Sequence, residues 1–193
     1  MIEFLKKLIL NFKERIHETN EKKLIIQSKI LSEKNKDKEK LDNLSDVEYS
    51  VFSQWGEDGI INWIISQEFQ INDYFIEFGT GDYKESNTRY LLQNSNWSGS
   101  LIEGNKNDYD KIVNWKKRWR YDINIKNEFI TKKNINDLIK SFNPPKNIGL
   151  LSIDIDGNDY WILKEINLNE LNPSIIIVEY NSLFGDKHKI TVP

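Results

Sequence analysis

The sequence predicts an α/β fold in which parallel strands alternate with helices. From residue 50 onward, short apolar runs alternate with stretches of helical periodicity, which is the pattern of successive β-α-β units. The runs 149–155 and 174–180 are continuous and rich in β-branched residues, as is typical of strands buried on both faces of a sheet. A third run, 74–78, leads into a glycine turn at Gly79 and Gly81. Together these observations predict one parallel sheet.

The individual elements follow from the same patterns. We expect strands at 74–78, 99–103, 128–131, 149–155 and 174–180. We expect helices at 58–69, 86–94, 108–118 and 135–142. The last helix has to stop before Pro144 and Pro145, because proline lacks the N–H that continues a helix.

The first 40 residues have a composition of their own, with 11 Lys or Arg against 7 Asp or Glu and no glycine or proline. An apolar stripe at helical spacing comprises Leu5, Leu8, Ile9, Phe12 and Ile16. We expect a helical extension and charged linker over 1–48 and one domain over 49–193. The stripe would pack on its own domain, pair with a second copy, or lie on a membrane surface between its basic flanks.

Composition excludes several classes of protein. The net charge of −3 gives no sign of a nucleic-acid partner, which would favour a basic face. The absence of cysteine rules out disulfides and thiolate metal sites and fits a cytoplasmic protein. The N-terminal stretch is interrupted by Lys6 and Lys7, so it is too short to span a bilayer, and no cleavage site of small residues follows it.

The most informative motif is Glu77-x-Gly79-x-Gly81, because an α/β sheet turns on such glycines to form an adenosine site. The next apolar run ends in Glu103, 22 residues beyond Gly81, where a carboxylate can hold ribose hydroxyls. Lys84 occupies the place of the third glycine in a dinucleotide fingerprint, and Glu77 is an acid where nicotinamide sites carry a neutral residue. The pattern is instead similar to E-x-G-x-G, the first motif of S-adenosylmethionine (SAM)-dependent methyltransferases, which favours SAM over a nicotinamide cofactor.

Five blocks of the sequence resemble the FkbM-like SAM-dependent methyltransferases in order and spacing. They are 52–59 (FSQWGEDG), 75–79 (FIEFG), 101–105 (LIEGN), 152–160 (SIDIDGNDY) and 177–181 (IVEYN). The resemblance implies a Rossmann-like methyltransferase sheet of order 3-2-1-4-5, SAM as methyl donor, and methyl transfer to oxygen on sugars or glycan precursors. It also implies further strands beyond Pro193, so we expect the domain to be incomplete at its C-terminal end.

Ligands of such sheets bind beyond the carboxyl ends of the strands, which identifies the candidate cofactor residues. Glu77, Gly79 and Gly81 are expected at the methionine end of SAM and Glu103 at the ribose, with Asn105 close by and Asn134 at the adenine edge. Gln54 and Asp58 precede the sheet and could close over the ligand. Asp58 could equally cap the helix that it begins.

Candidate catalytic residues follow the fourth expected strand. Asp154 and Asp156 would point to the same side if the strand continued through both, near Glu179 after the next strand. One aspartate could act as general base toward a hydroxyl, or the oxygens could bind a divalent ion. We expect no tightly held metal, because the cluster offers no preformed loop of known ligand geometry. Alternatively, the acids from Asp156 to Asp159 cap the following helix. His188 is a further candidate base.

Two other expectations concern function class and assembly. A non-catalytic module with the same fold remains an alternative to an enzyme. In a 3-2-1-4-5 sheet, the apolar run 174–178 lies at an edge, and a bare edge of this kind is a template for pairing with another chain. We therefore expect a homodimer, or an unstable fragment, rather than a stable monomer.

Overall fold

The computed structural model describes residues 2–68, 70–180, 185, 187, 190 and 191. By internal contacts the chain forms two compact units, residues 1–67 and 68–193, which are described separately below. His188 lies outside the described residues.

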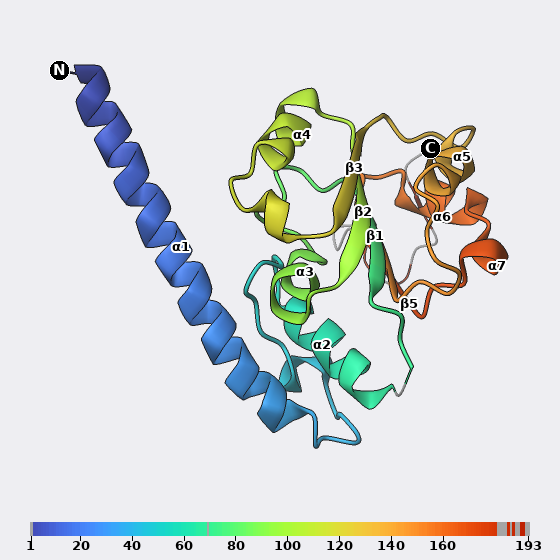
Figure 1. Cartoon of the computed structure of the whole chain (residues 1–193). Coiled ribbons are helices and arrows are strands. Elements are labelled where there is room, and N and C mark those ends of the chain that lie inside the picture. The colour runs from blue at the N-terminus through green and yellow to red at the C-terminus, as the bar shows by residue number, and fades with distance from the viewer. Residues whose placement is uncertain (1, 69, 181–184, 186, 188–189, 192–193) are drawn as a thin grey trace. The chain divides into compact units, whose positions relative to one another are not determined.

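The first unit is helical. Helix α1 spans Ile2–Asn35, a short 3-10 helix η1 spans Leu44–Asp46, and helix α2 spans Glu57–Gln67 (Figure 1). The end of α1 is held to the rest of the unit by polar side chains. Asn62 of α2 donates to the Ser32 hydroxyl, and Asn35 donates to the carbonyl of Val47 at 3.5 Å. Trp63 donates its indole N–H to the carbonyl of Lys38 at 3.0 Å.

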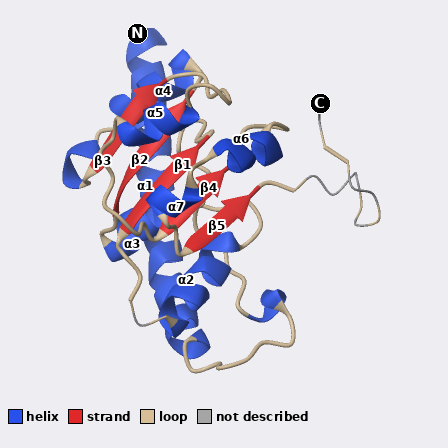
Figure 2. Cartoon of the chain, turned by 90° about the vertical axis from the view of Figure 1, so that its right-hand side faces the viewer, coloured by secondary structure: helices blue, strands red, loops and turns tan. Residues whose placement is uncertain are grey.

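The second unit is built on a five-stranded sheet of order β3-β2-β1-β4-β5 (Figure 2). The strands are β1 Tyr74–Phe78, β2 Ser98–Glu103, β3 Ile123–Asn127, β4 Leu150–Ile153 and β5 Ile175–Val178. Every neighbouring pair is parallel. The predicted Rossmann-like fold class and its strand order are confirmed.

Helices cover both faces of this sheet. They are α3 Arg89–Ser95, α4 Lys106–Val113, η2 Arg118–Arg120, α5 Ile135–Lys140, α6 Asp159–Glu165 and α7 Leu168–Leu171. In Figure 1, α3 and α4 lie on one face of the sheet and α5, α6 and α7 on the other. On the second face, Ile76 and Phe78 of β1 are fully buried in a core with Ile135 of α5 and Ile162 of α6. This core fixes the positions at which the strands end.

The third strand was predicted wrongly at 128–131, because β3 is an edge strand of the sheet and is half polar. Its pairing runs from Gly99↔Ile123 to Glu103↔Asn127, so it ends where the expected strand begins. Only Ile123 of the strand is buried, and Asn124 is exposed. A search for continuous apolar runs therefore selects the wrong segment, 128–131, which follows the strand.

The opposite edge is β5, which pairs on one side with β4 through Ile175 to Val178. No other described strand pairs with it. Ile176 is 41% exposed, so β5 leaves apolar surface in solvent. A second copy of the chain was expected to cover this edge. That homodimer stays a prediction. Among the residues that the structure describes, no helix is long and apolar enough to cross a membrane.

The glycine turn after β1 yields a stability prediction. Gly79 has φ +73°, and a Cβ there would lie 1.6 Å from the carbonyl oxygen of Asp154; Gly81 has φ +52° and open space around it. Both alanine variants should lose about 1–2 kcal/mol for the left-handed backbone. Gly79→Ala should lose a further 1–3 kcal/mol or more, roughly, from the overlap. Urea unfolding followed by circular dichroism measures both, and equal losses would contradict the close approach.

Candidate functional site

The sheet register brings four residues into one row at the carboxyl ends of the strands. Phe78 pairs with Ile102 on one side and with Ile153 on the other, so the residues that follow them lie side by side. The row, here called the strand-end row, consists of Glu103 after Ile102, Gly79 after Phe78, Asp154 after Ile153, and Glu179 after Val178. Ligands of parallel α/β sheets bind at this edge.

Glu103 links the two loops that leave the neighbouring strands β1 and β2. Its Oε2 accepts from the Gly81 N–H at 2.8 Å, and its Oε1 accepts from the Asn105 N–H at 2.6 Å. The side chain is 7% exposed, so these charge-assisted bonds are largely shielded from water. A carboxylate oxygen can accept more than one hydrogen bond, which leaves acceptor capacity on both oxygens.

Glu77 is buried, and its carboxylate organises the start of α3. It accepts from the Ser86 hydroxyl at 2.7 Å, the Thr88 hydroxyl at 2.5 Å and the Asn87 N–H at 3.0 Å. Loss of hydration raises the pKa of Glu77, and these hydrogen bonds oppose the rise. The place of Glu77 at the methionine end of SAM stays a prediction. Its hydrogen bonds show that it holds the loop between β1 and α3, which contains Gly81.

The loop after β3 places an aromatic ring, which the sequence reasoning missed, against Gly104 in the loop after β2. Phe129 is 77% exposed, and a Cβ at Gly104 would lie 3.2 Å from carbon atoms of its ring. An exposed ring against a glycine can offer its face to a flat ligand. The error in placing β3 hid this residue, because Phe129 was taken as part of a strand. Its position after β3 is the sequence signal that could have found it.

Both predicted asparagines hold the loops beside this ring. Asn105 caps α4 by accepting from the Asn107 N–H at 2.9 Å. Asn134 accepts from the Thr131 N–H at 2.7 Å and donates to the Phe129 carbonyl at 2.9 Å. Asn134 therefore fixes the loop that carries Phe129, and its contact with adenine stays a prediction.

The other two predicted cofactor residues, Gln54 and Asp58, belong to the first unit. Asp58 is 1% exposed, and its Oδ2 accepts from three successive N–H groups, those of Val51, Phe52 and Ser53, at 2.6–2.9 Å. Burial raises the pKa of Asp58 against these bonds. The side chain thus holds the segment before α2, and Gln54 within that segment is exposed. Their closure over a ligand stays a prediction.

An acidic cluster lies beyond β4 and β5. Carboxylate oxygens of Asp154, Asp156 and Glu179 all lie within 4.8 Å of one another, and such a group could hold a cation. The aspartates come together for a different reason from the predicted one, because β4 ends at Ile153. The chain instead turns at Asp156, which has φ +56°. Asp159 holds this turn by accepting from the Ile155 and Gly157 N–H groups at 2.8 and 2.9 Å.

The electrostatics of the cluster single out Asp154. Loss of hydration, followed by the negative charges of Glu179 and Asp159, raises the pKa of Asp154 to about 7. Loss of hydration and the charges of Asp159 and Asp156 also raise the pKa of Glu179. A carboxyl group whose pKa lies near neutrality can both take up and release a proton at physiological pH.

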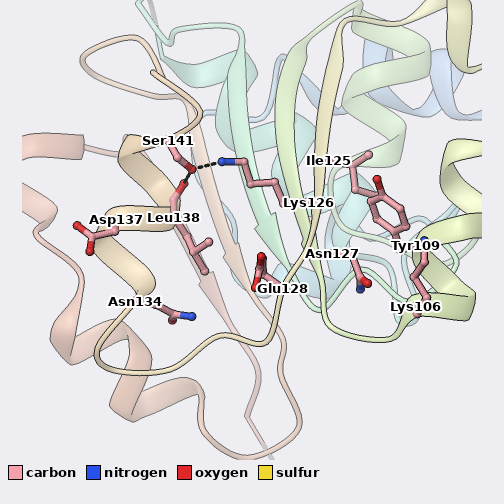
Figure 3. Close-up of a pocket in the computed structure, with 10 residues that line it drawn as sticks. All are labelled: Lys106, Tyr109, Ile125, Lys126, Asn127, Glu128, Asn134, Asp137, Leu138 and Ser141. Atoms are coloured by element: carbon pink, nitrogen blue, oxygen red, sulfur yellow. Dashed lines mark hydrogen bonds between the residues drawn. The ribbon is translucent and has the colours of Figure 1, made fainter.

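A cavity of about 600 Å³ lies beside the row, along the outer edge of β3 (Figure 3). It is lined from α4 by Lys106 and Tyr109, from β3 by Ile125, Lys126 and Asn127, then by Glu128 and Asn134, and from α5 by Asp137, Leu138 and Ser141. Lys126 donates to the Ser141 hydroxyl across it, as Figure 3 shows. Asn127 pairs with Glu103 in the sheet register, so the cavity adjoins the end of the row where Phe129 lies.

The strand order is that of a Rossmann-like sheet and is consistent with a methyltransferase fold. Residues 46–190, which are 145 of the 193 residues, match the model of the methyltransferase FkbM domain family. The chain therefore belongs to this family, and the predicted resemblance is confirmed. No curated protein and no solved structure gives a significant match.

The raised pKa of Asp154 predicts how stability depends on pH. Its value in the folded protein, about 7, lies above its ordinary value of 3.8, so ionisation of this group lowers the stability progressively between these pH values and remains unfavourable above them. Asp154→Asn should therefore raise the melting temperature more at pH 8 than at pH 5. Differential scanning calorimetry of both proteins measures this difference.

A matched variant tests the cause of that effect. Glu179→Gln removes the neighbouring charge that raises the pKa of Asp154 most, so it should lower that pKa, as followed by carbon-13 NMR of the carboxyl group. An Asp154→Asn effect of the same size at both pH values would show that the group does not titrate in this range.

Proposed function

We propose that this methyltransferase uses SAM as donor and methylates a hydroxyl oxygen of a sugar or glycan precursor. The choice of SAM as donor rests on the position of the Glu103 carboxylate. It bridges the Gly81 and Asn105 N–H groups at the end of β2, and its remaining acceptor capacity suits the two ribose hydroxyls of an adenosine. The bare side of Gly81 gives such a ligand room against the backbone.

The other residues of the strand-end row suit the rest of SAM. The exposed ring of Phe129 beside Gly104 offers a stacking surface for adenine, next to the ribose contact. Asp154 and Glu179 at the other end of the row provide negative charge toward a cationic sulfonium and ammonium. A dinucleotide would place a pyrophosphate anion in the same row, which these acids disfavour.

Bound SAM would supply an electrophilic methyl group, whose bond to sulfur breaks as S-adenosylhomocysteine is released. The acceptor hydroxyl is far too weakly acidic to ionise by itself at neutral pH, so a base has to take its proton as the oxygen–carbon bond forms. Asp154 is suited to this step because its pKa is about 7 and its deprotonated form is present at neutral pH. The proton would pass to Asp154. The sugar acceptor rests on the family resemblance, because members often act on such substrates.

Isothermal titration with S-adenosylhomocysteine (SAH) tests the donor. We expect SAH to bind and NAD not to bind. Glu103→Gln leaves one oxygen acceptor and places an NH₂ group against an N–H donor. The loss of a charged acceptor costs about 1.5–3 kcal/mol, which corresponds to roughly tenfold to a hundredfold weaker SAH binding. Glu165→Gln makes the same chemical change at the exposed end of α6 and should leave the affinity unchanged. Binding of NAD without SAH would refute the proposal.

Transfer of a tritiated methyl group from SAM to a panel of sugars and sugar nucleotides tests the base. Asp154→Asn should lower the rate about 10²–10⁴-fold, because the base is lost. SAH has no sulfonium charge to pair with Asp154, so its affinity should change much less than the rate. The wild-type rate should rise with pH through about 7. Activity that disappears with EDTA and returns with Mg²⁺ would instead assign the acidic cluster to a cation and contradict the role of Asp154 as a free base.

A further inference from the structure

Helix α1 carries an apolar stripe that the protein leaves in solvent. The stripe is formed by Leu5, Leu8, Ile9, Phe12 and Ile16, whose side chains are between 47% and 65% exposed. These positions follow the spacing of one helix face. A contiguous exposed row of large apolar side chains on a long helix marks an interaction surface.

The protein buries a different side of the same helix. Glu21, Ser28 and Asn35 are 8%, 2% and 7% exposed, and their spacing of seven residues places them on one line along α1. At about 100° per residue this line lies on the opposite side of the helix from the centre of the stripe. The stripe is therefore not the face by which α1 packs in the described structure.

The charged residues of α1 are sorted around the stripe. At about 100° per residue, Lys6 and Lys13 flank one side of it and Arg15 and Lys22 flank the other. Glu3, Glu18 and Glu21 lie farther round, on the side of the helix away from the stripe. The charged residues named on the two flanks of the stripe are therefore all basic.

We propose that α1 lies on an anionic lipid surface, with the stripe inserted among the acyl chains near the headgroups. Long basic side chains on the flanks can extend their alkyl stems along the apolar layer while their charged ends reach lipid phosphates. Each such cation near an anionic surface adds attraction that salt screens. The helix would lie in the plane of the surface, because the lysines beside the stripe leave no stretch long enough to cross it.

Charge placement favours lipid over a second copy of this chain. In a pair of helices packed along their stripes, the flanking positions of one helix meet those of the other. Two copies would bring Lys6, Lys13 and Arg15 against equally basic flanks, and like charges there oppose association. An anionic surface neutralises these same residues.

Co-sedimentation of the full chain with phosphatidylcholine vesicles, with and without phosphatidylglycerol, tests the proposal. We expect binding to the anionic vesicles, weaker binding without phosphatidylglycerol, and loss of the difference at high salt. Ile9→Glu should weaken binding about tenfold or more, because it places a charge in the apolar layer. Leu24→Glu makes the same change of charge off the stripe and should alter binding by less than about threefold. Circular dichroism should show that both variants stay folded, because both side chains are exposed.

Three results would overturn the proposal. The wild-type chain could fail to bind anionic vesicles. It could bind them with Ile9→Glu unaffected, which would mean attraction by charge without insertion. Sedimentation equilibrium could instead reveal a dimer that Ile9→Glu dissociates in a chain with no affinity for vesicles, which would assign the stripe to a second copy.

Discussion

The site depends on one close approach between two strand ends. Gly79 follows β1 and lies so near the carbonyl oxygen of Asp154 after β4 that no side chain fits between them. This contact requires glycine, and it sets Asp154 in line with Glu103 across the single residue that follows β1. The fully buried core beneath, with Phe78 against Ile153, keeps both strands in register. The geometry of the candidate site at this edge is thus a consequence of how closely two backbones can pack.

The elements that bury apolar side chains on both faces could be predicted from the sequence, and the half-polar ones could not. The run Leu150–Ile153, for example, buries all of its side chains and is recognisable as a strand because those side chains need cover on each face of the sheet. Edge strand β3 buries only one of its side chains, so polar residues such as Asn124 and Lys126 are tolerated in it. Its sequence therefore lacks the apolar pattern by which a strand is recognised. The same reasoning explains why Phe129 was missed, because this exposed residue lies just outside that strand.

The sequence predicted the positions of the acidic residues better than it predicted their hydrogen-bond partners. Glu77 and Asp58 are candidates in a motif, but folding gives each of them several backbone or hydroxyl donors. Those donors come from ordinary polar residues whose arrangement only the folded loops reveal. Likewise, the meeting of Asp154 with Asp156 follows from a left-handed turn at Asp156, which no alternation rule contains. Short-range backbone geometry was the missing information.

The position of Glu103 also links binding to motion. A single carboxylate fixes the N–H groups of both Gly81 and Asn105, so the loops after β1 and β2 share one anchor. Local opening of either loop then weakens the hold on the other, and the two should fluctuate as one cooperative unit. A ligand that binds to the same carboxylate would order both loops together, so the entropy cost of ordering them arises in a single binding event. The affinity of this edge of the sheet for a ligand therefore depends on both loops together.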